Sequence, residues 1–94
     1  MIGIERRAVY VMKIYTFNGK SNLCGDKIRS LREKKRLSQE QLAAKMQVEG
    51  VQINQKAVSR IETGDRVVTD YEVMVFARVL GVEAQQLLRE QKSE

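Results

Sequence analysis

The residues of this chain that are best suited to specific chemistry are four polar side chains at helical spacing between positions 55 and 60. Glutamine can form paired hydrogen bonds with adenine, arginine and lysine can address the acceptors of guanine, and serine can contact several bases. A face that is merely solvated has a similar composition. The elements around these residues must decide between the two readings. The four residues are Gln55, Lys56, Ser59 and Arg60.

The four side chains fall largely on one side of a helix that the sequence predicts from Gln55 to Thr63. Asn54 is a good N-cap for this helix, and Gly64 can end it in the left-handed conformation. Apolar residues recur on the opposite side at the spacing of an amphipathic helix. They are Ala57, Val58 and Ile61. One face is therefore expected to pack while the other stays free for polar contacts.

A second amphipathic helix is predicted immediately before this one. Ser38 and Gln41 have the spacing of a capping box, in which each side chain bonds to the backbone N–H of the other residue. Gly50 can adopt the left-handed conformation that ends a helix. Two capped helices in succession favour a groove-reading unit over a solvated face. The apolar residues on the packing face of the first helix are Leu42, Ala43 and Met46.

The stretch from Leu37 to Leu88 resembles the phage-repressor and Cro-like helix-turn-helix family, also called the XRE family. The matching motifs are LSQEQLA in the first helix, VSRIETG at the end of the second, and ARVLGV followed by LL. Several linked motifs in the same order are more specific than one short pattern. The resemblance implies an all-α, compact five-helix domain that binds operator DNA, usually as a two-fold symmetric dimer.

The resemblance also assigns roles by position. Gln39 is similar to the family's phosphate-contacting glutamine, which lies at the start of the helix before the reading helix. Glu62 is expected to hold the fold. Arg66 is expected near a phosphate, because the turn after the reading helix lies beside the DNA backbone in the family; an ordinary surface role is the alternative. The base-facing positions of the family fall on Gln55, Lys56, Ser59 and Arg60.

The chain departs from the family in the connection between the two helices, which is predicted to run from Gln47 to Ile53. It is about five residues longer than the family's common tight turn, which adds little loop-closure entropy. The two helices are therefore expected to dock in spite of the longer connection, with Val51 and Ile53 as its apolar anchors.

A formal net charge of +5 and a pI near 9.6 favour a polyanionic partner. Basic residues cluster from Asp26 to Arg36, just before the two helices. In the amphipathic helix predicted there, Ile28 and Leu31 turn inward and the cations face outward. Such a cluster attracts phosphates nonspecifically, and Lys27 is expected to bind one; a solvated charged face is the alternative. The cations are Lys27, Arg29, Arg32, Lys34, Lys35 and Arg36.

Two further helices are predicted after Gly64. Thr69 and Glu72 form a second capping box, with Val68 and Val73 placed as a hydrophobic staple. The helix that begins there is the fourth along the chain, and Gly81 ends it. Its inward stripe is Val73, Phe76, Ala77 and Leu80. Val82, Leu87 and Leu88 suggest a short fifth helix after it. Additional apolar residues are expected either to pack against the N-terminal segment or to form a dimer seam. They are Met74, Val75 and Val79.

The N-terminal segment has a different composition. Residues 9–17 are rich in strand formers, and residues 18–22 are typical of a turn or linker. A strand here would pair with its copy across a dimer, lie on the helical core, or stay disordered until bound. Met12 is an alternative start of translation, which the intact mass of the native protein would test. We expect a tail over 1–22, a helix-turn-helix domain over 23–90 and a tail over 91–94.

Composition excludes several other classes. The chain of 94 residues suits one small domain. It has no apolar stretch long enough to span a bilayer and no secretory signal, so a cytoplasmic location is expected. It has no His, and Cys24 has no partner for a disulfide or a cysteine-based metal cluster. Without a glycine-rich phosphate loop or clustered carboxylates, we expect neither an enzyme nor a cofactor.

These features predict a sequence-specific transcriptional regulator, and more narrowly a repressor that binds double-stranded DNA as a homodimer. The alternative is a protein-interaction adaptor or antitoxin that keeps a helix-turn-helix core but reads little DNA. Salt distinguishes the two, because phosphate contacts weaken steeply with added salt and an apolar protein interface does not.

Overall fold

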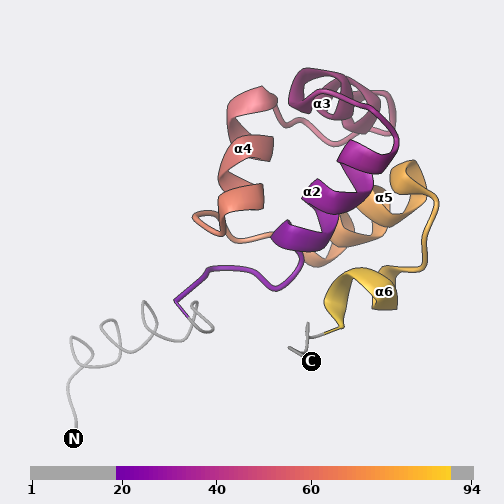
Figure 1. The fold of residues 1–94 in the computed structure, drawn as a ribbon. Coiled ribbons are helices and arrows are strands. Elements are labelled where there is room, and N and C mark those ends of the chain that lie inside the picture. The colour runs from indigo at the N-terminus through magenta and orange to yellow at the C-terminus, as the bar shows by residue number, and fades with distance from the viewer. Residues whose placement is uncertain (1–18, 90–94) are drawn as a thin grey trace, which may run out of the picture.

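A computed structural model describes residues 19–89, and its regular elements within this range are five α-helices (Figure 1). The all-α, five-helix architecture is therefore confirmed. The strand predicted between Val9 and Phe17 lies outside the described residues. In chain order the helices are α2 (Gly25–Lys34), α3 (Gln39–Val48), α4 (Gln55–Thr63), α5 (Asp70–Leu80) and α6 (Ala84–Leu88).

One apolar core is shared by all five helices. Each helix places at least one large side chain in it at an exposure of 1% or less. A buried side chain of this size contributes about 1.5–3 kcal/mol through the hydrophobic effect. The inward stripes predicted from helical spacing are confirmed. The largest of these side chains are Ile28 of α2, Leu42 and Met46 of α3, Val58 and Ile61 of α4, Phe76 and Leu80 of α5, and Leu87 of α6.

Local sequence signals fix the starts of α3 and α5. Ser38 Oγ accepts from the Gln41 backbone N–H at 2.9 Å while Gln41 Oε1 accepts from the Ser38 N–H at 2.8 Å. The same reciprocal pair joins Thr69 and Glu72 at the start of α5. Each N-cap contributes about 1 kcal/mol. Both capping boxes are confirmed.

The connection between α3 and α4 is partly buried. The helix α3 continues through Val48, so the connection is Glu49–Asn54 and begins later than predicted. Val51 and Ile53 are each 5% exposed, and Gln47 Nε2 donates to the Ile53 carbonyl oxygen at 2.6 Å. The longer connection is thus tied to the core.

Two apolar residues lie differently from the prediction. Val75 belongs to the core, because α5 contacts α2, α3 and α6 and so buries a wider arc than its stripe. Leu88 is 48% exposed, because neighbouring residues on a helix point about 100° apart and Leu87 takes the inward position. Of the residues proposed as a seam, Val79 is half-buried and Met74 is exposed.

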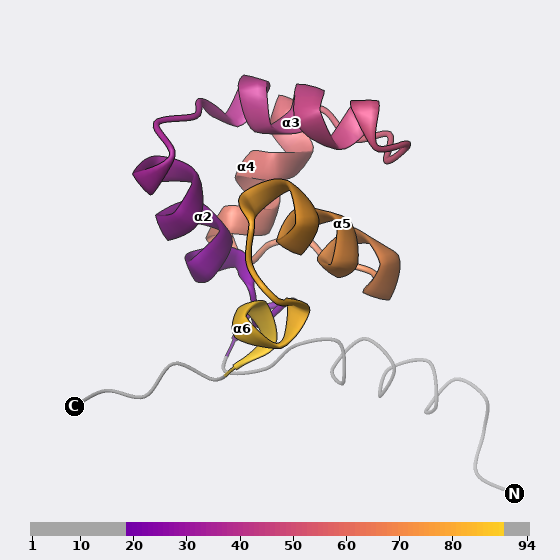
Figure 2. The same cartoon turned by 90° about the vertical axis from the view of Figure 1, so that its right-hand side faces the viewer.

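The two ends of the domain differ in character. In both views α3 lies at one end and α6 at the other, with α2 and α5 between them (Figures 1 and 2). The polar starts of α3 and α4 are linked to each other, as described below, whereas α6 closes the core at the far end with a single buried leucine. The candidate site and the C-terminal closure of the fold are therefore separate in space.

Candidate nucleic-acid interface

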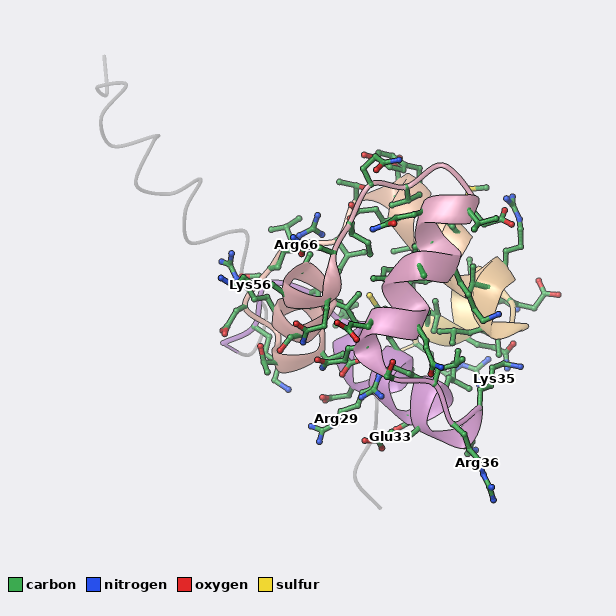
Figure 3. The ribbon with its side chains drawn as sticks, turned by 90° about the horizontal axis from the view of Figure 1, so that it is seen from above. Arg29, Glu33, Lys35, Arg36, Lys56 and Arg66 are labelled. Atoms are coloured by element: carbon green, nitrogen blue, oxygen red, sulfur yellow. The ribbon has the colours of Figure 1, made fainter. Side chains whose placement is uncertain are left out.

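The exposed side of α4 carries most of the residues predicted to read bases. Gln55, Lys56 and Arg60 are exposed and Ser59 is half-buried, while Val58 and Ile61 on the other side are fully buried. Asn54 caps the helix by accepting from the Ala57 backbone N–H at 2.8 Å. Figure 3 shows Lys56 reaching outward. The structure brings the predicted residues together on one face, with Ser59 lying deeper than the others.

A side-chain hydrogen bond joins the starts of α3 and α4. Gln55 Nε2 donates to Gln39 Oε1 at 2.6 Å, and Gln39 Nε2 donates to Glu62 Oε1 at 2.9 Å. A carboxylate only accepts hydrogen bonds, so the nitrogen of Gln39 must face Glu62 and its oxygen must face Gln55. The amide of Gln55 is thereby oriented as well. Within residues 19–89 its oxygen and its second N–H have no hydrogen-bond partner, so they are available to another molecule.

Glu62 anchors this chain of hydrogen bonds inside the domain. Its side chain is 2% exposed and pairs with Arg32, with Nε–Oε2 at 2.7 Å and Nη2–Oε1 at 3.1 Å. The hydrogen bond to Glu62 raises the pKa of Arg32 above its ordinary value. Arg32 also donates to the Leu37 carbonyl oxygen at 2.7 Å. The role expected for Glu62 in holding the fold is confirmed.

A clamp that the sequence did not reveal joins the start of α2 to the end of α4. Asn22 Nδ2 donates to the carbonyl oxygens of Ile61, at 3.0 Å, and Arg66, at 2.8 Å, while its Oδ1 accepts from the Gly25 N–H at 2.7 Å. A Cβ at Gly25 would overlap the Ile61 carbonyl oxygen. The composition of residues 18–22 indicated a linker, and no local signal marks a partner about 40 positions away.

The outward direction predicted for the cations of α2 is wrong for Lys27 and Arg32. Lys27 Nζ is buried and has no hydrogen-bond partner among the described residues, and Arg32 points to Glu62. Residue 27 lies one turn before Leu31, which packs against the core, so the two share a face of the helix. Lys27 is therefore not placed to bind a phosphate in this structure.

Arg66, the other predicted phosphate ligand, is bound to Glu72. Its Nη1 and Nη2 donate to the two carboxylate oxygens at 3.0 and 3.1 Å. Burial raises the pKa of Glu72, but hydrogen bonds from Arg66 and from the Thr69 backbone outweigh burial and hold that pKa below its ordinary value of 4.5. Arg66 thus ties the turn after α4 to the start of α5 while its side chain stays 29% exposed.

A basic surface remains along α2 after these corrections. Arg29, Lys34, Lys35 and Arg36 are exposed, and Arg29 pairs with Glu33 one turn later at 3.3 Å. Figure 3 shows Arg36 extending away from the ribbon at the end of the helix. Exposed cations of this kind attract a polyanion over roughly a Debye length of 10 Å.

The described residues offer little for other chemistry. Residues 19–89 hold no group of three or more His, Cys, Asp or Glu side chains that could bind a metal ion. Cys24 is 1% exposed, and burial raises the pKa of its thiol to about 11. Within the same range, every helix is too short or too polar to cross a bilayer.

Comparison with family models identifies the family to which this chain is similar. Residues 24–91 match the family model described as a helix-turn-helix domain. This range is well over half of the chain, and it contains all five helices from α2 to α6. No curated protein matches the chain.

Proposed function

The chain belongs to the helix-turn-helix domain family, and on this premise we propose that it is a sequence-specific transcriptional repressor that occupies promoter DNA through α4 and so excludes polymerase. The observation that carries the proposal is the bond between Gln39 and Gln55. It holds the first exposed side chain of α4 in one orientation, which a solvated face does not require. A fixed orientation favours base reading, because bases are distinguished by the pattern of donors and acceptors that the side chain presents.

The first turns of α4 enter the major groove. Gln55 then offers its carbonyl oxygen to adenine N6–H and its free N–H to adenine N7, the pair of contacts by which glutamine distinguishes adenine. Lys56 and Arg60 address the acceptors of guanine, and Ser59 makes a shorter contact from its deeper position. The buried side of α4 fixes the direction in which this polar face points from the domain.

Backbone phosphates are contacted around this reading face. Gln39 uses one N–H on Glu62, and its amide nitrogen has a second N–H for a phosphate oxygen. Arg66 keeps Nε free of described partners while Glu72 holds its other nitrogens, and it contributes a second contact. The exposed cations of α2 add long-range attraction. We assign no phosphate to Lys27, because its ammonium group is buried.

Two copies are needed for useful selectivity, because one reading helix contacts only a few base pairs. The operator is therefore an inverted repeat whose half-sites are about 10 base pairs apart, the spacing at which two such helices enter successive major grooves. This part of the proposal is about assembly on DNA, and it holds whichever surface joins the two copies.

Selection from a random DNA pool tests the proposal. We expect the full-length protein to enrich an inverted repeat with adenine and guanine at the α4-facing positions, because these are the bases its side chains pair with. Affinity for the enriched site should fall steeply as salt rises from about 50 to 200 mM. A pool without any enriched sequence, or an affinity that does not change with salt, would contradict the assignment.

A second candidate function is a protein-interaction adaptor or antitoxin. The observation in its favour is the exposure of Tyr71, Met74 and Leu88, which form an apolar surface beside α6. Such a protein would bind its partner with little dependence on salt. Failure of the DNA selection, together with salt-independent binding to a protein, would favour this function.

Single substitutions on the reading face separate specificity from general affinity. We expect Gln55→Ala and Arg60→Ala each to lose roughly 1–3 kcal/mol of discrimination at one or two base positions while the fold is kept. Gln39→Ala should weaken binding to all sequences and also relax the adenine preference, because Gln55 loses the group that orients it.

Fluorescence anisotropy with the enriched site and with single-base variants of it provides the measurement. Lys45→Ala is the matched control, since it removes an exposed cation from the last turn of α3, away from the linked helix starts. Equal losses on specific and random DNA for all the reading-face variants would overturn the assignment of the readers.

A further inference from the structure

An exposed apolar groove lies between the start of α5 and α6. It has a volume of about 520 Å³, and Asp70 is the charged residue among those that line it. Three large apolar side chains on it are 48–58% exposed. Exposed apolar side chains gathered in one groove make it a candidate binding site. The groove is lined by Val68, Asp70, Tyr71, Val73, Met74, Ala84 and Leu88.

The proposed function does not account for this groove. Base reading uses the polar starts of α3 and α4, whereas the groove borders α6 at the end of the domain opposite α3 (Figures 1 and 2). The groove must therefore bind something other than DNA. The occupant must be apolar, and a basic residue beside its apolar side chains would complement Asp70.

We propose that the N-terminal segment of the same chain, residues 1–18, docks in this groove, with Ile14, Tyr15 and Phe17 as its apolar anchors. This segment closes the apolar surface that the five helices leave open. The groove then serves as an intramolecular docking site, and the anchors become an extension of the core.

The point at which the segment meets the described fold supports this occupant. Ser21 N–H donates to the Gly64 carbonyl oxygen at 2.8 Å, and Asn22 donates to the carbonyl oxygen of Arg66. Val68, which lines the groove, follows Arg66 by two positions. Five extended residues from Asn22 to Phe17 span up to roughly 17 Å. The anchors are therefore tethered close to the rim of the groove.

Composition also favours this segment. Of the two parts of the chain outside the described residues, 90–94 reads EQKSE, whereas residues 8–17 read AVYVMKIYTF. Lys13 follows Met12 and precedes Ile14, which supplies a cation beside the anchors to complement Asp70. Tethering raises the local concentration of the segment to the millimolar range, so even weak contacts suffice for docking in cis.

Methyl NMR of the full-length chain, with labelled methionine, tests the proposal. The chain has four methionines; Met74 lies in the groove and Met46 is fully buried in the core. We expect nuclear Overhauser contacts from the Met74 methyl group to the rings of Tyr15 or Phe17. The substitutions Tyr15→Leu and Phe17→Leu should remove those contacts and shift the Met74 signal, while the Met46 signal stays in place. Met74→Leu identifies the signal.

Oxidation by hydrogen peroxide gives a second measurement that does not depend on assignments. Docking should protect Met74, so that the variant Ile14→Ser/Tyr15→Ser/Phe17→Ser is oxidised there several-fold faster than the unmodified protein. Equal rates, with no segment contacts at Met74, would overturn the proposal. Contacts found only between differently labelled copies would show that a second copy fills the groove, and this too would overturn docking in cis. Neither outcome bears on DNA reading by α4, which the selection experiment tests separately.

Discussion

Replacing Gly25 with alanine should destabilise this domain by about 3 kcal/mol, the upper end of the usual cost of overpacking. Helix propensity alone predicts the opposite sign, because alanine is a better helix former than glycine. The added Cβ would overlap the Ile61 carbonyl oxygen, and that backbone cannot move away without pulling on α4. The expected loss is a large fraction of the 5–15 kcal/mol that typical domains possess.

Urea unfolding followed by circular dichroism measures this loss, and Gly50→Ala is its matched control. Gly50 has φ of +93° and no atom within 4 Å of an added Cβ. Alanine there would be strained in its backbone conformation but would not clash with a neighbour. The control should lose about 1–2 kcal/mol, the cost of the left-handed conformation for an L-residue. A loss at Gly25 no larger than that at Gly50 would show that the approach of α2 to α4 is not tight.

Features that depend on a few neighbouring residues could be predicted from the sequence. Each helix cap depends on residues only a few positions apart, and the structure contains every cap that was predicted in this way. They are the capping boxes at Ser38 and Thr69, the N-cap at Asn54 and the left-handed end at Gly64. The inward stripes follow in the same way from helical spacing. These signals are local, so they can be recognised without knowing what the helices pack against.

Features that depend on packing between distant segments could not be predicted. The direction of Lys27 and Arg32 is set by neighbouring helices, and a basic residue on a predicted helix reads as exposed unless its partner is known. Asn22 resembles a linker residue until its bonds to the end of α4 are seen. Val75 is buried because three helices cover α5, which periodicity along α5 does not reveal.

The candidate site shows the same division. Residue types and spacing identified the polar face of α4, and the resemblance assigned Gln39, at the start of the preceding helix, to a phosphate contact. Neither indicated that Gln39 contacts both Gln55 and Glu62, since these residues lie 16 and 23 positions away. The orientation of the reading face is thus a tertiary property, and it begins at a buried ion pair.

Breaking that ion pair should have the second large effect. We expect Arg32→Ala to lose roughly 3–5 kcal/mol of stability, because it leaves the buried carboxylate of Glu62 without its charged partner. Arg29→Ala is the control: it removes an exposed arginine of the same helix whose pair with Glu33 contributes roughly 0.3–0.5 kcal/mol. Thermal and urea unfolding measure both, and similar losses for the two would contradict a structural role for Arg32.

Removing both charges separates the two tasks of the ion pair. The double variant Arg32→Met/Glu62→Leu should regain most of the lost stability, because apolar residues of similar size often replace a buried ion pair at no net cost. It should not regain the adenine preference. Gln39 then has no carboxylate to fix its amide, so Gln55 Nε2 loses a defined acceptor. A stable double variant that still discriminates adenine as the unmodified protein does would show that Gln55 is oriented by the DNA itself, and that Glu62 serves only the fold.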